Sequence, residues 1–126
     1  MNNRILLVDD DLDIATSYKI GLGDHDFIVS IYNDPKIALS EFKEGLYDLL
    51  LTDIRMPGIS GTELYEKMKR IDDKIKVCFI TGFQEYYQEL EKALPGLELH
   101  RCYILKPITI SDLVEKIKTI LEPDIS

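Results

Sequence analysis

Short apolar runs that alternate with helical patterns are the feature that most constrains the fold of this chain. Five runs have the length and composition of strands, and they lie near residues 4–8, 27–31, 48–52, 76–81 and 102–105. The first, third and fifth runs are nearly continuous in apolar residues, which is typical of parallel strands that helices cover on both faces. Because parallel strands need right-handed helical crossovers, the pattern predicts a doubly wound α/β sheet in one domain, residues 1–126.

Local signals support helices between these runs. The intervening segments carry apolar residues at helical spacing. Asp34 precedes Pro35, which predicts a capped helix start with proline in the first turn. Thr109 precedes Asp112 by three residues, a variant of the capping box, and predicts the start of the last helix.

Composition narrows the class of protein. With 45% hydrophobic and 30% charged residues, the chain can bury a core. Its net charge of −8 disfavours direct binding to nucleic acid. No apolar run approaches the ~20 residues of a membrane span, and the first residues enter a strand-like run at once, so we expect neither membrane insertion nor a signal peptide. Cys78 and Cys102 lie in strand-like segments without a CxxC partner, and we interpret them as buried reduced thiols of a cytoplasmic protein.

Polar groups suited to one charged site follow three of the apolar runs. Asp9, Asp10 and Asp11 follow the first run, Asp53 follows the third, and Lys106 follows the fifth. The carboxyl ends of parallel strands meet at the edge where open α/β proteins bind ligands. Clustered carboxylates repel one another unless a cation compensates, and Mg²⁺ suits such a cluster. The set therefore predicts a magnesium site at which one carboxylate can carry a phosphoryl group.

These motifs together resemble a known family. The chain shows Asp9-Asp10, then the segment 53–58 (DIRMPG) with Gly61, then Thr81-Gly82, then Lys106-Pro107. Their order and spacing resemble the receiver domain of two-component response regulators, the family of the chemotaxis receiver proteins, over essentially the whole chain. The resemblance implies a flavodoxin-like (βα)5 sandwich whose five parallel strands have the order 2-1-3-4-5.

The resemblance also implies roles for the acids. Asp53 would accept a phosphoryl group from a histidine kinase or a histidine phosphotransfer protein. Asp10 would bind Mg²⁺ directly, with Mn²⁺ as an alternative ion, and Asp9 would act through water or by orienting ligands. Asp53 and the backbone carbonyl of Arg55 would complete the protein ligands.

The remaining matched residues would transmit the change. Lys106 would pair with Asp53 at rest and with the phosphoryl group afterwards, and Thr81 would donate its hydroxyl to that group. Tyr103 would turn inward as Thr81 moves, which would alter the face made by the helical segment around 84–94, the run 102–105 and the last helix. Pro107 would follow a cis peptide bond that aims Lys106.

Two further positions are expected to set the phosphoryl lifetime. Arg55 lies two residues after the acceptor and Phe83 two residues after the threonine, where receivers line the path of attacking water. We expect both bulky side chains to slow autodephosphorylation. The segment 94–103 departs from the family pattern, and the stretch from Thr81 to Lys106 is a few residues longer than usual. The resemblance therefore does not determine the output protein or effector domain, or whether the domain forms a homodimer.

Plainer interpretations stand beside these. Asp9-Asp10-Asp11 alone would most often be a solvated turn or a helix cap, and Asp11 is more typical of a cap than of a ligand. Lys106 alone could be a surface lysine, and Tyr103 could simply fill the core.

The leading hypothesis is a signalling switch that catalyses only its own phosphorylation and dephosphorylation. The alternatives are a phosphohydrolase with an aspartyl nucleophile, for which Asp9 and Asp11 have a suitable spacing, and a receiver-like module used only for protein interaction.

Overall fold

The computed structural model describes residues 3–83, 86–97 and 99–122. Within these residues a sheet of five parallel strands has the order β2-β1-β3-β4-β5. The strands are β1 (Arg4–Val8), β2 (Ile28–Tyr32), β3 (Leu49–Thr52), β4 (Lys76–Thr81) and β5 (Tyr103–Leu105). The helices are α1 (Leu12–Gly23), α2 (Pro35–Glu41), α3 (Gly61–Ile71), α4 (Tyr86–Ala93), α5 (Leu99–Cys102) and α6 (Ile110–Leu121). The predicted doubly wound sheet and its strand order are confirmed.

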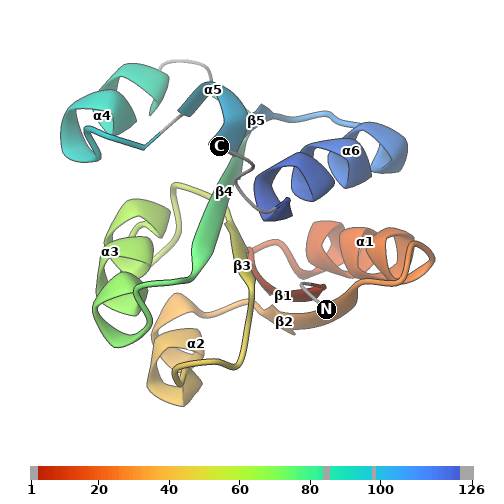
Figure 1. The fold of residues 1–126 in the computed structure, drawn as a ribbon, viewed down its shortest axis with the longest axis horizontal. Coiled ribbons are helices and arrows are strands. Elements are labelled where there is room, and N and C mark those ends of the chain that lie inside the picture. Colours follow the sequence, from red (N-terminus) through yellow and green to blue (C-terminus); the bar gives the residue numbers. More distant parts are fainter. Residues whose placement is uncertain (1–2, 84–85, 98, 123–126) are drawn as a thin grey trace.

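Helices cover both faces of the sheet, with α1 and α6 on one side and α2, α3 and α4 on the other (Figure 1). β1 shows why its sequence is apolar throughout. Ile5 and Leu7 point into the core shared with α1 and α6, whereas Leu6 and Val8 point into the core on the other side. All four side chains are fully buried, so alternate residues of one strand serve two cores.

Each strand boundary lies within one residue of its prediction, and the predicted helix starts are present. The side chain of Asp34 accepts a hydrogen bond from the amide of Lys36 at 2.9 Å, with Pro35 in the first turn of α2. Thr109 Oγ1 accepts from the amide of Asp112 at 3.1 Å at the start of α6. These caps satisfy amides that the first helical turn leaves without backbone partners.

One prediction in the segment before β5 was wrong. Cys102 ends the short helix α5 and does not open the strand, and β5 begins one residue later, at Tyr103. Residues 99–102 of this segment form a helical turn, which Leu99 anchors by burying its side chain in the core beneath α3 and α4. A run of four apolar or mixed residues cannot distinguish a helical turn from a strand by periodicity. Cys78 and Cys102 are both buried, as expected.

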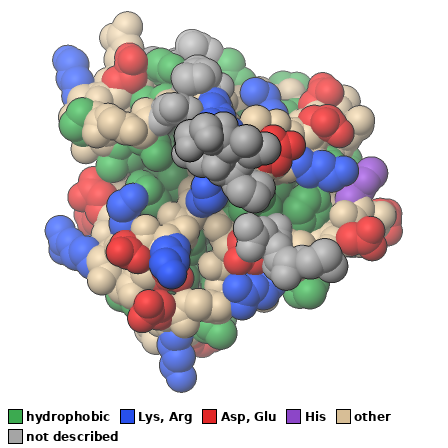
Figure 2. Space-filling view, viewed as in Figure 1, with side chains coloured by type: hydrophobic (Ala, Val, Ile, Leu, Met, Phe, Trp, Pro, Cys, Tyr) green, Lys and Arg blue, Asp and Glu red, His purple; other side chains and the backbone are tan. Residues whose placement is uncertain are grey.

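None of the helices in the described part of the chain combines the length and apolar character needed to cross a membrane. On the face that Figure 2 shows, acidic and basic side chains are intermixed, with no broad area of one sign.

Candidate functional site

The register of the sheet brings the predicted acids together. Val8 pairs with Thr52 across β1 and β3, so Asp9 and Asp53 are the next residues after two aligned strand ends. The amide of Asp53 donates to the carbonyl of Val8 at 3.2 Å, which extends the ladder to Asp53. Both side chains therefore start from the carboxyl edge of the sheet.

Three carboxylates meet at this edge. One oxygen from each of Asp9, Asp10 and Asp53 lies within 4.8 Å of the other two. Asp9 is buried, Asp53 is partly buried and Asp10 is exposed at the mouth. A set of carboxylate oxygens that is open on one side fits a hard divalent cation such as Mg²⁺, which keeps several water ligands.

Lys106 supplies the positive charge. Its Nζ lies 3.1 Å from Asp9 Oδ2 and 3.4 Å from Asp53 Oδ2, so it bridges acids from two strands. The Lys106–Pro107 peptide bond is cis, as expected. The amide of Lys106 donates to the carbonyl of Thr81 at 2.8 Å, which fixes the backbone of the lysine against the end of β4.

The ionisation of the site reflects burial and charge together. Burial raises the pKa of Asp53 above its ordinary value, and the nearby Asp9 adds to this, although Lys106 and the amide of Ile54 partly offset the rise. Burial acts to lower the pKa of Lys106, but Asp53 and Asp9 outweigh it and the pKa is raised. The lysine therefore stays charged, while any further cation at the site would stabilise the ionised form of Asp53.

Asp11 has a structural role. Its side chain caps α1 by accepting hydrogen bonds from the amides of Asp13 and Ile14, at 3.1 and 3.2 Å. Its own amide donates to Asp9 Oδ1 at 2.9 Å. The interpretation of Asp11 as a cap is confirmed, and the same turn holds Asp9 in place.

Gly61 allows the loop after β3 to fold against the backbone of Asp53. A Cβ atom at this position would lie 2.0 Å from the carbonyl oxygen of Asp53. The amide of Gly61 donates to the carbonyl of Ile54 at 2.8 Å. Only glycine permits this approach, so the first residue of α3 helps to hold the residues that follow Asp53.

The predicted switch residues lie beside one another. Thr81 is buried at the end of β4, and its Oγ1 accepts a hydrogen bond from the amide of Phe83 at 3.3 Å. Tyr103 is buried with its hydroxyl donating to the carbonyl of Phe83. The aromatic ring of Tyr103 also packs edge-on against Tyr87 of α4, with ring centroids 5.2 Å apart. One loop residue, Phe83, thus connects the threonine with the tyrosine.

The two residues expected to set the lifetime share a partner that the sequence analysis missed. Arg55 and Phe83 are both exposed, and both contact Tyr86, the first residue of α4. The sequence shows only that the segment around 84–90 is rich in aromatic residues. An aromatic-rich segment does not predict which side chains from other loops its residues will contact.

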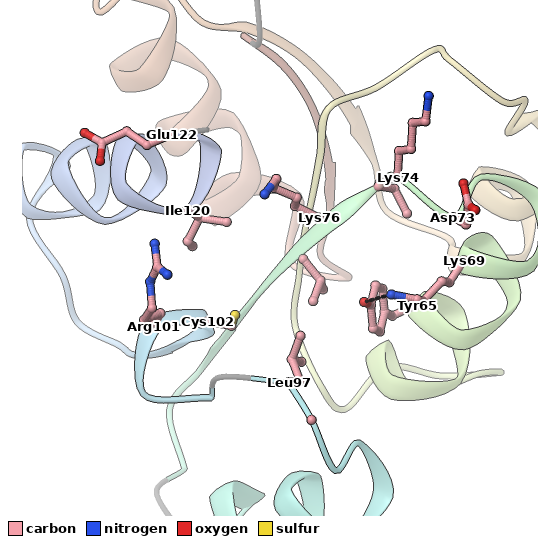
Figure 3. Close-up of a pocket in the computed structure, with 13 residues that line it drawn as sticks. Tyr65, Lys69, Asp73, Lys74, Lys76, Leu97, Arg101, Cys102, Ile120 and Glu122 are labelled. Atoms are coloured by element: carbon pink, nitrogen blue, oxygen red, sulfur yellow. Dashed lines mark hydrogen bonds between the residues drawn. The ribbon is translucent and has the colours of Figure 1, made fainter. Parts of the chain in front are cut away.

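A separate hollow of about 480 Å³ lies at the other end of β4, as Figure 3 shows. Lys76 at the start of β4, Tyr65 of α3, Arg101 of α5 and Ile120 of α6 line it. None of the residues predicted for the site lies there. The acidic cluster therefore lies outside this hollow, at the carboxyl ends of β1 and β3.

Comparison with known proteins decides the family. The model of the response regulator receiver domain matches residues 5–118. This chain belongs to that family. Membership in this family, the receiver domain of two-component response regulators, accounts for the fold.

Curated relatives of this receiver domain include stand-alone and longer proteins. The response regulator receiver protein CpdR of Brucella abortus is 32% identical over 118 residues, covering 94% of this chain and 96% of that protein. The transcriptional regulatory protein PrrA of Mycobacterium leprae is 30% identical over 119 residues, covering 94% of this chain but 49% of that protein. The chain spans about half the length of the first curated relatives it matches.

Solved structures agree with this assignment. A CheY-like receiver domain protein from Methanospirillum hungatei matches with a TM-score of 0.81 and 34% identity, over 96% of this chain and 94% of that one. The response regulator TrrA from Thermotoga maritima, solved in complex with Mg(2+)-BeF, matches with a TM-score of 0.79 and 30% identity, over 94% of this chain and 99% of that one.

Proposed function

We propose that this receiver domain accepts a phosphoryl group on Asp53 from a phosphohistidine of a histidine kinase or a phosphotransfer protein. The observation that supports this most directly is the contact of Lys106 with both Asp53 and Asp9 beside a third acid, Asp10. In the transfer, a carboxylate oxygen of Asp53 would attack phosphorus. A P–O bond would form, and the P–N bond to the histidine would break.

The three acids fit a divalent cation, and we propose that it is Mg²⁺. Asp10 and Asp53 would hold the ion directly, Asp9 would act mainly through water, and the backbone carbonyl of Arg55 would add a third direct protein ligand. When bound, Mg²⁺ supplies positive charge that neutralises the acids and a phosphoryl oxygen. Mn²⁺ has the same preference for oxygen ligands and is the alternative ion.

Other residues of the site would orient and stabilise the transferred group. The ammonium of Lys106 would move from its two acids to a phosphoryl oxygen, and the hydroxyl of Thr81 would donate to another. Because Thr81 and Tyr103 both bond to Phe83, a shift of the threonine would reach the face formed by α4, β5 and α6. We propose that this face engages an output protein or effector domain, in the cytoplasm, and that self-association is a second outcome of the change.

A phosphohydrolase with Asp9 as nucleophile is the second candidate, and the burial of Asp9 counts against it. Asp9 is 1% exposed, its Oδ2 faces Lys106 and its Oδ1 accepts from the amide of Asp11. The side chain of Asp53 makes comparable contacts, with Lys106 and the amide of Ile54, but it is 18% exposed. Asp53 is more accessible, which favours it as the acceptor. We therefore propose a switch that catalyses only its own phosphorylation and dephosphorylation, and an interaction-only module would leave this set of groups unused.

The test is intact-mass measurement after treatment with acetyl phosphate and Mg²⁺. We expect wild type to gain one phosphoryl group, and Asp53→Asn and metal-free wild type to gain none. Asp13→Asn, an exposed acid in the first turn of α1, is the matched control and should behave as wild type. Steady hydrolysis of a phosphate ester that is lost in Asp9→Asn and kept in Asp53→Asn would instead establish the phosphohydrolase. A wild-type protein that gains no mass would refute phosphorylation.

A further inference from the structure

Tyr86 is the common partner of the two residues expected to shield the phosphorylation site. Arg55 comes from the loop after β3, two residues beyond Asp53, and Phe83 comes from the loop after β4, two residues beyond Thr81. These loops are far apart in sequence. Tyr86 begins α4 and contacts both side chains.

The contact with Arg55 has two components. The guanidinium Nη1 of Arg55 donates a hydrogen bond to the hydroxyl of Tyr86 at 3.2 Å. Its central carbon also lies 5.9 Å from the centroid of the Tyr86 ring, within the range of a cation–π interaction. An exposed arginine that makes no such contact samples many rotamers, so these interactions restrict where the guanidinium lies.

The contact with Phe83 is aromatic. The rings of Phe83 and Tyr86 pack edge to face with centroids 5.6 Å apart. Phe83 is 53% exposed, so its ring has few other neighbours to hold it in one position. The backbone of Phe83 is fixed separately, by the hydrogen bonds to Thr81 and Tyr103.

We propose that Tyr86 is a positioning residue that joins Arg55 and Phe83 into one shield over the phosphorylated site and so sets the phosphoryl lifetime. This inference rests on the proposed phosphorylation of Asp53. Tyr86 does not touch the reacting atoms and acts only through its two partners. Because Tyr86 belongs to α4, it attaches the shield to one of the elements that form the proposed output face. A displacement of α4 would then loosen the shield and shorten the lifetime.

The experiment measures the decay of phosphorylated protein in Mg²⁺ after the donor is removed. Loss of the hydrogen bond in Tyr86→Phe should shorten the lifetime roughly twofold, and loss of the ring as well in Tyr86→Ala roughly threefold to tenfold. Tyr87→Phe is the matched control, because it removes the hydroxyl of the next residue on the same helix, whose ring packs on Tyr103. That variant should keep the wild-type lifetime.

A combined variant separates positioning from general loosening of the fold. If Tyr86 acts through its partners, Tyr86→Ala should change the lifetime less than twofold when Arg55→Ala and Phe83→Ala are already present. Equal effects of Tyr86→Ala in both backgrounds, or a wild-type lifetime in Tyr86→Ala alone, would overturn the inference.

The NMR resonance of the Arg55 side-chain Nε provides a readout without phosphorylation. It should shift in Tyr86→Phe and not in Tyr87→Phe. An unchanged resonance in Tyr86→Phe would contradict the contact between Arg55 and Tyr86 in the unphosphorylated protein. A wild-type protein that shows the shift but never accepts a phosphoryl group would confirm the contact, and would overturn the proposed function together with the lifetime role.

Discussion

Lys106 lies closer to Asp9 than to Asp53, with its Nζ 3.1 Å from Asp9 Oδ2. At rest, the lysine therefore neutralises part of the negative charge that would attract a divalent cation. The distance from Lys106 Nζ to Asp53 Oδ2 is 3.4 Å, so the same ammonium also interacts with Asp53. Cation binding and the position of Lys106 are coupled through the acids they share.

Removal of the lysine should therefore strengthen metal binding while it impairs phosphorylation. Lys106→Met removes the competing positive charge, and we expect Mg²⁺ affinity to rise roughly threefold to tenfold, equivalent to about 1 kcal/mol of relieved repulsion. The phosphorylation rate with acetyl phosphate should fall at saturating Mg²⁺. Titration calorimetry and intact mass measure the two effects. Unchanged or weaker Mg²⁺ binding in Lys106→Met would show that the ammonium does not compete with the cation.

The close approach of Gly61 to the acceptor gives a prediction about stability. Gly61→Ala would place a Cβ atom 2.0 Å from the carbonyl oxygen of Asp53, so the loop must move. We expect a loss of about 2–4 kcal/mol in the free energy of unfolding and slower phosphorylation of Asp53. Chemical denaturation and intact mass are the measurements.

The control for that change is another helical glycine. A Cβ atom on Gly23, at the end of α1, would have no neighbour within 4 Å. Gly23→Ala should therefore be neutral or stabilising by up to about 1 kcal/mol. Equal stability of the two alanine variants would mean that the loop after β3 adapts at little cost.

The position of the acids could be predicted from the sequence, whereas the contacts of the surrounding side chains could not. Asp9 and Asp53 could be placed because each ends a continuous apolar run, and parallel strands bring such ends to one edge. The contact between Arg55 and Tyr86 could not be predicted, because it depends on the rotamers of two exposed side chains from loops far apart in sequence. The helix α5 was missed for a different reason: a single turn is too short to show a period.

An ion pair distant from the site should make stability depend on pH. Asp48 accepts hydrogen bonds from the amide, Nε and Nη2 of Arg4, at 2.9, 3.2 and 3.0 Å. Burial acts to raise the pKa of Asp48, but these bonds and the charge of Arg4 outweigh it and hold the pKa below its ordinary value. A lowered pKa in the folded state contributes stability above the unfolded pKa of ~3.9, and that stability is lost as the pH falls toward the folded value.

Asp48→Asn should therefore cost about 1 kcal/mol at neutral pH, and the difference from wild type should shrink below about pH 4. Urea denaturation at several pH values measures it. The control is Glu63→Gln, which removes an exposed pair with Lys67 at 3.6 Å on the surface of α3 and should cost less than about 0.5 kcal/mol. A constant difference between Asp48→Asn and wild type from pH 7 to pH 3 would contradict the role of ionisation.

Ionisation of Asp53 should affect stability with the opposite sign to that of Asp48. Because burial and the neighbouring Asp9 raise the pKa of Asp53, its ionised form destabilises the folded state at neutral pH when no divalent cation is present. Asp53→Asn removes that charge, so its midpoint of thermal unfolding in EDTA should exceed that of wild type at pH 7. The gain should diminish as the pH falls and vanish below the unfolded pKa of ~3.9, where both side chains are neutral. Added Mg²⁺ should stabilise wild type and reduce the difference, since the cation binds only the folded site. A lower midpoint for Asp53→Asn in EDTA at pH 7 would mean that the ion pair with Lys106 outweighs burial.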